Sequence, residues 1–304
     1  MSIKAKELVK YYGTQKALDN VSFEVKPGEI VGFIGPNGAG KTTAMKILTG
    51  YMMPNSGEAW INEKNALQET LEIRNDIGYL PEHNPLYTQM YIKEYLEYVA
   101  GLYNLGRQTE QRIHEVIELT GLNKEKTKKI STLSKGYRQR VGLAQAIIHD
   151  PGVLILDEPT TGLDPNQIAE IRSLISRLGE EKTVLLSTHI MQEVEAICDR
   201  IIVINNGRIV ADDKVENISS RLEENKQTVQ VEFNREVEED TLSAIEGVNR
   251  VRKIDAKNWL LESMDEADVR QRIFDFAVQT GLSVLSMQKK EKSLEEVFQD
   301  LTRE

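Results

Sequence analysis

The chain has 304 residues, with 38 basic and 48 acidic side chains and a formal net charge of −10. This length exceeds a typical single domain, so we expect two domains of unequal size. The acidic balance argues against a nucleic-acid surface as the main partner. The single cysteine, Cys198, excludes an internal disulfide, and we expect it to be a buried small side chain.

The N-terminal segment MSIKAKELVKYYG lacks the apolar region of a signal peptide. No run of about 18 apolar residues, the length needed to cross a bilayer, occurs in the chain. We therefore expect a cytoplasmic protein, whose role at a membrane would depend on a separate partner.

The first 30 residues alternate apolar and polar side chains and turn at Pro27 and Gly28, which predicts short antiparallel strands. Residues 29–35, EIVGFIG, are almost wholly apolar, as is typical of a strand buried on both faces. A change of secondary structure is thus expected near residue 30.

Residues 85–150 have mostly helical periodicity, and we expect helices to end at Gly101, Gly106 and Gly121. The segments GVLILDEP and TVLLSTH then repeat the buried-strand pattern, separated by the amphipathic PNQIAEIRSLISRLGE. Buried strands alternating with helices predict a mostly parallel sheet with ligands at the carboxyl ends of its strands. Residues 219–304 read as a small, separate α+β domain without a catalytic motif.

Residues 35–42, GPNGAGKT, follow a buried strand and open a helix. At this spacing backbone amides can surround phosphate oxygens, a lysine can reach the β and γ phosphates, and a threonine can hold Mg²⁺. The nucleotide-binding residues expected here are Gly35, Pro36, Asn37, Gly38, Ala39, Gly40, Lys41, Thr42 and Thr43.

Two acids, Asp157 and Glu158, follow the next buried strand. Because neighbouring residues of a strand point to opposite sides, we expect Asp157 to face Mg²⁺ and Glu158 to face the water that attacks the γ-phosphate. An exposed turn carrying two acids is the alternative. His189 ends a further strand at the same edge and could contact the γ-phosphate and orient the water.

The segment LSKGYRQRVGLAQAII places Ser134 where a helix N-cap belongs, and Gly136 permits close approach. This would be a second anion site, although the chain already has one phosphate loop. Such a site makes sense if it faces the nucleotide of another subunit.

Together these motifs resemble the ATP-binding cassette (ABC) family of transporter ATPases. GPNGAGKTT resembles its Walker A motif, LSKGYRQ its signature, VLILDEP its Walker B motif, TGLDP with Asp164 its D-loop, and STH its switch histidine. The resemblance covers residues 1–218 and implies a P-loop α/β cassette. This would have a mostly parallel sheet core, an antiparallel β subdomain and a helical subdomain at about residues 85–150.

The resemblance also implies partners and cofactors, ATP and Mg²⁺ among them. Two such domains would pack head to tail around two ATP molecules, each held by Walker A of one chain and the signature of the other. The signature residues implied are Ser134, Lys135, Gly136 and Tyr137. With one set of motifs, the chain would form a homodimer, or a heterodimer with another ABC subunit, on a separate transmembrane permease.

Tyr12 falls where the family keeps an aromatic that stacks on adenine. A position in the core is the alternative for this tyrosine and its neighbour Tyr11.

Two departures from the family pattern indicate closer kin. Lys135 and Tyr137 replace the usual Gly and Gln of the signature, as in an export-type subfamily whose C-terminal extension ends much like SLEEVFQDLT. The stretch YLPEHNPLY, together with that C-terminal tail, also resembles gliding-motility-associated ABC ATP-binding subunits.

Glu82 falls at the family's Q-loop, where a glutamine normally touches Mg²⁺ or the attacking water. We hypothesise that Glu82 acts through the metal, directly or by water, and the alternative is a loop acid that points to solvent. Downstream, Tyr87, Tyr91, Tyr95 and Tyr98 recur at the spacing of one helix face. They are expected either in the core or at the groove that receives a coupling helix of the membrane subunit.

The main hypothesis is an energy-coupling ATPase subunit of a membrane exporter, peripheral on the inner face of the membrane. The competing hypothesis is a soluble ABC protein that acts on nucleic acid or ribosomes. Such relatives carry two cassettes in tandem or a long insertion, and neither is visible here. A third hypothesis makes the C-terminal domain a regulatory or dimerising module.

Overall fold

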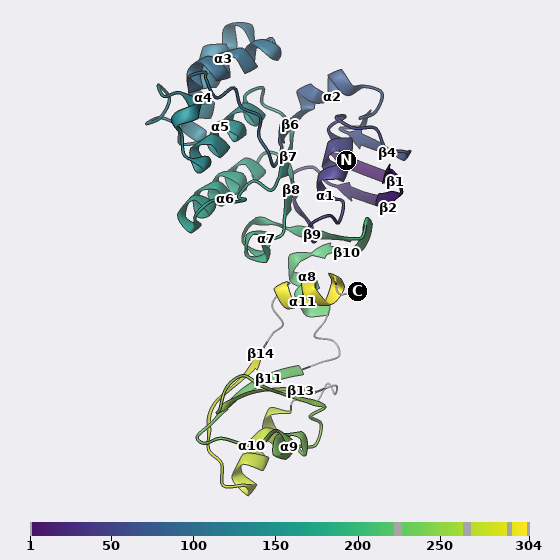
Figure 1. Ribbon diagram of the computed structural model, residues 1–304, viewed down its shortest axis with the longest axis vertical. Helices are drawn as coiled ribbons and strands as arrows, with labels where there is room; N and C mark the ends of the chain where they lie inside the picture. The colour runs from purple at the N-terminus through teal and green to yellow at the C-terminus, as the bar shows by residue number, and fades with distance from the viewer. Residues whose placement is uncertain (1, 222–226, 264–268, 291–293, 303–304) are drawn as a thin grey trace. The chain divides into compact units, whose positions relative to one another are not determined.

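The computed structural model describes residues 2–221, 227–263, 269–290 and 294–302 (Figure 1). The chain divides into two units between Val215 and Glu216, close to the boundary expected near residue 218. Among the described residues, no helix is both long and apolar enough to span a bilayer. Each unit has its own hydrophobic core.

The first unit is built on a six-stranded sheet. From one edge to the other its strands are β10 (Arg208–Lys214), β9 (Arg200–Asn205), β3 (Ile30–Ile34), β8 (Thr183–Thr188), β7 (Val153–Asp157) and β6 (Ile77–Leu80). All neighbours are parallel except β10 and β9. Every residue of β3, β7 and β8 is buried, which explains their continuous apolar sequences. The mostly parallel sheet is thereby confirmed.

An antiparallel sheet forms the second layer of this unit. Its strands, in order, are β2 (Gln15–Val25), β1 (Ile3–Tyr12), β4 (Ser56–Ile61) and β5 (Lys64–Asn65). The expected antiparallel strands are present, but β1 and β2 have 10 and 11 residues and are not short. Their hairpin turns at Gly13 and Thr14, whereas the turn at Pro27 and Gly28 leads into β3 of the other sheet.

Helix α1 (Lys41–Leu48) links the two sheets. Its Met45, Ile47 and Leu48 share one core with side chains of both, including Leu8 of β1 and Phe33 of β3. This packing fixes the start of α1 at the carboxyl end of β3. The first turn of the helix, where the phosphate loop ends, is thus held by apolar contacts on two sides.

A helical layer follows β6 and lies away from the antiparallel sheet in Figure 1. It contains α3 (Ile92–Leu102), α4 (Thr109–Leu119), α5 (Lys135–Ile147) and the single turns η1 (Gly106–Gln108) and η2 (Ile130–Thr132). Helix α2 (Thr70–Asp76) precedes β6. The expected helical subdomain is present, and its helices α3, α4 and α5 lie within residues 85–150.

The expected helix ends are partly wrong. Gly121 has φ +69° just after α4, as a C-terminal glycine should, but Gly101 lies inside α3. The left-handed residue after α3 is Asn104, at φ 55°, which a short polar side chain tolerates. Gly106 opens η1 and does not end a helix.

Two helices connect the strands β7, β8 and β9 in the chain. Helix α6 (Pro165–Gly179) begins behind Asp164, whose side chain accepts a hydrogen bond from the Gln167 backbone amide at 3.0 Å. Helix α7 (Met191–Ile197) follows β8 and begins two residues after His189. Cys198, which follows α7, is buried as expected, and burial raises the pKa of its thiol.

The second unit has an antiparallel sheet with the order β12 (Arg250–Lys253), β13 (Asn258–Ser263), β11 (Gln227–Phe233) and β14 (Val284–Lys290). With α9 (Glu239–Ser243) and α10 (Arg270–Gln279) this is the β-α-β-β-α-β pattern of ferredoxin-like domains. Trp259, Phe233 and Ile273 are central to its core. Helices α8 (Val215–Arg221) and α11 (Leu294–Thr302) flank the pattern in sequence.

Candidate nucleotide-hydrolysis site

A cavity of about 490 Å³ brings most of the expected nucleotide residues together. Its expected lining residues are Tyr12, Asn37, Gly38, Gly40, Lys41, Thr42, Thr43, Glu82, Glu158 and His189. They come from β1, the loop before α1 and the first turn of α1, the loop after β6, and the segments that follow β7 and β8. The cavity therefore lies at the carboxyl edge of the parallel strands, as expected for this class of sheet.

The loop between β3 and α1 depends on its glycines. Gly40 has φ +114°, and a Cβ there would lie 2.5 Å from the Ala17 carbonyl oxygen. A Cβ on Gly35 would lie 2.3 Å from the carbonyl oxygen of Ile204. Within the loop, the Ala39 amide donates to the Pro36 carbonyl at 3.1 Å. Gly35, Pro36 and Ala39 thus shape the loop without lining the cavity.

Lys41 is the first residue of α1 and is only 6% exposed. Its ammonium donates to the Gly35 carbonyl at 2.7 Å and to the Pro36 carbonyl at 3.3 Å, and lies 3.7 Å from Oε1 of Glu158. A buried ammonium needs such partners because desolvating a charge is costly. The loop thereby holds a positive charge at the cavity wall.

Glu158 is the first residue beyond β7 and has φ 50°, a left-handed conformation. The direction of the Glu158 side chain is therefore not set by the alternation of side chains along a strand, on which the prediction was based. The Glu158 backbone amide donates a hydrogen bond to the Ser187 hydroxyl at 2.9 Å. This uncommon backbone state places the carboxylate beside Lys41 at 7% exposure, so the alternative of an exposed acidic turn is wrong.

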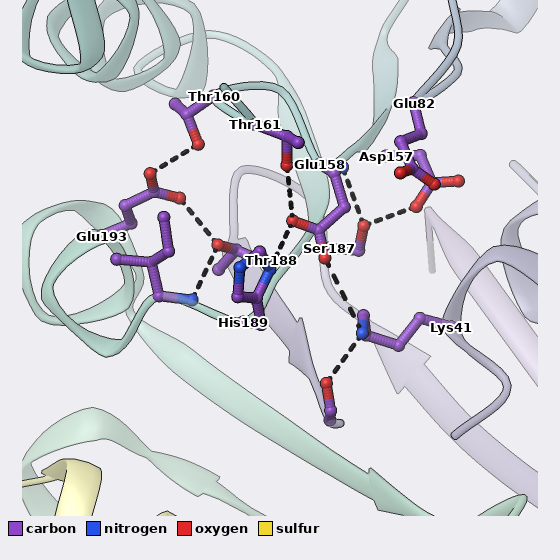
Figure 2. A network of polar contacts seen from close by, with 12 residues as sticks. Lys41, Glu82, Asp157, Glu158, Thr160, Thr161, Ser187, Thr188, His189 and Glu193 are labelled. Carbon is purple, nitrogen blue, oxygen red and sulfur yellow. Dashed lines mark hydrogen bonds and ion pairs between the residues drawn. The ribbon is translucent and has the colours of Figure 1, made fainter. Parts of the chain in front are cut away.

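His189 and Thr161 both contact Oε2 of Glu158 (Figure 2). Nδ1 of His189 lies 2.9 Å from it, and the Thr161 hydroxyl donates to it at 3.1 Å. The other oxygen, Oε1, faces Lys41. The two oxygens of this carboxylate thus have different surroundings.

Asp157 is the last residue of β7 and is fully buried. The Ser187 hydroxyl donates to Oδ1 at 2.6 Å, whereas Oδ2 has no hydrogen-bond partner among the described residues. Burial raises the pKa of Asp157, the Ser187 hydrogen bond and the nearby Thr42 hydroxyl oppose this, and the charges of Glu82 and Glu158 raise it further. A buried carboxylate oxygen without a donor, beside a hydroxyl and two more acids, suits a hard cation such as Mg²⁺.

Glu82 lies in the loop after β6, near Asp157 in Figure 2. Its side chain lines the nucleotide cavity and also a neighbouring cavity of about 520 Å³. Its Oε1 is 3.9 Å from Nδ1 of the exposed His83. The side chain therefore stands between two cavities and does not simply point away from the protein.

Tyr12 is 46% exposed, and Tyr11 is exposed as well, so the alternative of a core position is wrong for both. The Tyr12 hydroxyl donates to Sδ of Met52 at 3.1 Å, and the Lys10 ammonium lies 5.9 Å from the ring centroid. An aromatic ring at the cavity rim provides a stacking surface for a base.

The signature residues do not line the nucleotide cavity. Ser134 is the N-cap of α5, as expected, and accepts from the Tyr137 amide at 3.4 Å. A Cβ on Gly136 would lie 2.5 Å from Oε1 of Gln167 in α6. Lys135 approaches Gly162 closely, so the signature lies against the segment that contains Asp164.

Sequence reasoning missed three residues of the cavity wall, Gln15, Ala17 and Thr161. Gln15 and Ala17 belong to β2, and only the pairing of β1 with β2 brings them to the phosphate loop. Thr161 carried a weak signal, since a hydroxyl three residues beyond Glu158 in an irregular segment can reach its carboxylate.

The tyrosine pattern is partly wrong. Helix α3 begins at Ile92, so Tyr87 and Tyr91 precede it and do not lie on one face of a helix with Tyr95 and Tyr98. Tyr95 is buried and donates to Gln145 at 2.5 Å, while the other three are exposed. The Tyr87 ring packs edge to face on Tyr98 and Tyr95, with centroids 5.5 and 6.0 Å apart.

Comparison with known proteins gives a consistent result. Residues 18–161 match the family described as ABC transporter. The chain is 34% identical over 300 residues to the uncharacterized ABC transporter ATP-binding protein YxlF of Bacillus subtilis, covering 97% of this chain and 98% of YxlF. It is 33% identical over 307 residues to the bacitracin transport ATP-binding protein BcrA of Bacillus licheniformis, covering 97% and 95%.

Solved structures agree on the fold of the first unit. The dimeric, post-hydrolysis cassette MJ0796 bound to ADP and Pi is similar with a TM-score of 0.65 and 28% identity, over 70% of this chain and 98% of that one. An ATP-binding subunit of an ABC transporter is similar with a TM-score of 0.67 and 31% identity, over 73% and 94%.

Proposed function

The chain belongs to the family of ABC transporter ATP-binding proteins, which are ATPases, and from this premise we propose that it powers a membrane exporter. The observation that carries the proposal is that Lys41 and His189 both contact Glu158, in a cavity that the phosphate loop also lines. These groups combine a cation for phosphate with a carboxylate for water, which is what phosphoryl transfer to water needs.

In the proposed reaction the amides of the loop and the Lys41 ammonium bind the phosphates of ATP. Glu158 polarises the attacking water through Oε1, because His189 and Thr161 already engage Oε2. His189 thereby orients the carboxylate. Tyr12 lies at the rim of the cavity, where it provides a stacking surface for adenine.

Thr42 and Asp157 are proposed to hold the Mg²⁺ that accompanies ATP, with Glu82 acting directly or through water. Oδ2 of Asp157, which has no hydrogen-bond partner in the described part of the chain, supports this assignment, as does the placement of Glu82 within electrostatic reach of Asp157. Mg²⁺ would supply charge neutralisation at the phosphates. The three residues present oxygen atoms only, the ligand type that this metal prefers.

We also propose that the chain works as a dimer, with ATP between Walker A of one copy and Ser134, Lys135, Gly136 and Tyr137 of the other. Two observations support it. The signature lies outside the cavity of its own chain, and the related cassette MJ0796 has been described as a dimer. Asp164 would lie at the same interface because its segment packs on the signature. A homodimer is the simplest form, and a heterodimer with another ABC subunit would place the same residues at the interface.

The membrane partner is proposed to be a separate permease, which would hold this subunit on the inner face of the membrane. The relative BcrA is named for bacitracin transport and matches nearly the whole chain, which supports a role in transport. The gliding-motility association rests on the resemblance of YLPEHNPLY together with the C-terminal tail SLEEVFQDLT. The 520 Å³ cavity between Glu82 and the aromatic Tyr103 offers a place for a segment of the permease.

Purification of the chain from native membranes, followed by identification of copurifying proteins, tests this function. A polytopic membrane protein that raises the ATPase rate on reconstitution supports the proposal. A protein that remains without a membrane partner, and whose ATPase is stimulated by DNA, RNA or ribosomes, would instead establish the soluble alternative.

A further inference from the structure

We infer that Glu193 is a positioning residue that ties together the two loops carrying Glu158 and His189. The inference rests on the proposed ATPase function of that site. Glu193 lies on α7 and touches neither the nucleotide cavity nor Lys41. Its role is to hold the residues that do.

Glu193 is a buried acid, 2% exposed, whose two carboxylate oxygens have different donors. The Thr160 hydroxyl donates to Oε1 at 2.5 Å, and the Thr188 hydroxyl donates to Oε2 at 2.7 Å. Figure 2 shows this pair of contacts on the side of the network opposite to Lys41. A buried carboxylate satisfied by two neutral hydroxyls forms charge-assisted hydrogen bonds, which are short and strong.

The two threonines belong to different segments of the site, Thr160 to the loop after β7 and Thr188 to the end of β8. Thr160 lies between Glu158 and Asp164, and Thr188 immediately precedes His189. The Thr188 hydroxyl also accepts a hydrogen bond from the Ile190 amide at 3.1 Å, so it fixes the backbone on both sides of His189. Glu193 is therefore the second bridge between these loops, after the direct contact of His189 with Glu158.

The loops need such a bridge because regular structure does not hold them. Strand β7 ends at Asp157, and the segment that follows has positive φ at Glu158 and Gly162. Strand β8 ends at Thr188, so His189 lies outside it, and its side chain is about half exposed. Without the two hydroxyl contacts, the orientation of Oε2 would depend on the Thr161 hydroxyl and on an imidazole that is about half exposed.

The bridge also joins the catalytic base to the segment of Asp164. A displacement of that segment, as on contact with a second copy of the chain, would move Thr160 and hence Glu193 and Thr188. Glu193 thus offers a route by which an event at Asp164 alters the position of His189. Coupling of this kind is measurable as non-additivity between substitutions.

The test compares Glu193→Gln with Glu195→Gln in the full chain. Both changes remove one acid from α7, but Glu195 is exposed. We expect Glu193→Gln to lower kcat about tenfold to a hundredfold with KM for ATP changed less than about twofold, the effect of a misplaced catalytic group. Glu195→Gln should behave as the unsubstituted protein.

Thr160→Val and Thr188→Val keep the side-chain shape, remove one donor each, and test the same bridge if Glu193→Gln fails to fold. Each should lower kcat in the same sense. The double variant Glu193→Gln with His189→Ala should be no slower than His189→Ala alone, since both changes act on the same carboxylate.

The inference is overturned if kcat falls only in proportion to the loss of folded protein, or if the Glu193 and His189 effects multiply independently. The proposed function has a separate criterion. If the unsubstituted chain shows no Glu158-dependent ATPase, the proposed function fails, whereas a normal ATPase that is indifferent to Glu193, Thr160 and Thr188 removes this inference alone.

Discussion

Nδ1 of His189 lies 2.9 Å from Oε2 of Glu158, although 31 positions separate the two residues in the chain. The contact exists because β7 and β8 are parallel neighbours that end at the same edge of the sheet. Lys41 approaches the other oxygen of the same carboxylate at 3.7 Å. One glutamate thus receives a histidine from one side and the phosphate-loop lysine from the other.

Glu158→Gln is expected to lower kcat about 10²- to 10⁴-fold while ATP binding is retained, because an amide cannot act as general base. The nucleotide-bound state should accumulate as a dimer, visible as a doubling of mass by light scattering with ATP. Glu181→Gln, at an exposed position before β8, is the matched control. A Glu158→Gln protein that stays monomeric with ATP and hydrolyses it normally would contradict the assignment of Glu158 as general base.

Lys41→Ala is expected to weaken ATP binding about tenfold or more, because the charge-assisted contacts to phosphate are lost. The removal also leaves Glu158 without its cation, so some loss of stability should accompany it. Equilibrium titration with a fluorescent ATP analogue measures the affinity. Lys26→Ala, an exposed lysine on the turn before β3, should leave the affinity unchanged.

Glu82→Gln is expected to raise the Mg²⁺ concentration for half-maximal ATPase activity about three- to tenfold, since one negative charge near the metal is removed. For Glu82→Asp this Mg²⁺ concentration should lie between the values of Glu82→Gln and the unsubstituted protein. The measurement is the ATPase rate at constant free ATP over a Mg²⁺ series, with the exposed neighbour His83→Ala as control. An unchanged Mg²⁺ curve for Glu82→Gln would contradict the metal role.

His149 makes the stability of the first unit dependent on pH. Its ring stacks on Tyr103 with centroids 3.8 Å apart, Nε2 donates to the Ile77 carbonyl at 3.0 Å, and burial lowers its pKa to about 4. In the unfolded chain His149 binds a proton near pH 6.5, whereas in the folded chain it stays neutral down to about pH 4. Stability that is present above pH 6.5 is therefore lost as the pH falls towards 4.

The contribution of His149 to this loss should be about 2 kcal/mol between pH 7 and pH 5. His149→Phe keeps an aromatic ring for the stack and removes the titration, so its free energy of unfolding in urea should fall less over that interval. His114→Phe, at an exposed position of α4, is the control. Equal pH dependence in His149→Phe and the unsubstituted protein would show that the ring is protonated in the folded state.

A chain ending at Val215 tests the role of the second unit. All residues of the nucleotide cavity precede this position, and the first unit has its own core, so ATP binding should persist. If residues 216–304 are a dimerising module, which is the third hypothesis drawn from the sequence, the ATP-dependent increase in mass should disappear. A truncated protein that dimerises as the full chain does would remove that role.

Much of the fold was visible in local sequence patterns. Continuous apolar runs predicted β3, β7 and β8, and the serine before α5 predicted its N-cap. The failures share a cause, since they concern local geometry that packing overrides. Gly101 remained helical because Asn104 takes the left-handed position instead, and Tyr87 and Tyr91 precede α3 although their spacing suits a helix.

The sequence by itself determined the chemistry of the site. Glycines, a lysine, a threonine and acidic residues at fixed spacing after buried strands are compatible with few functions other than binding and hydrolysing a nucleotide. Only the tertiary structure decided which oxygen of Glu158 meets Lys41, and that Glu193 joins Thr160 to Thr188. It also decided that one oxygen of Asp157 has no donor among the residues that the structure describes. These relationships depend on which strands are neighbours and on a left-handed residue at 158, and neither is encoded in the spacing of a motif.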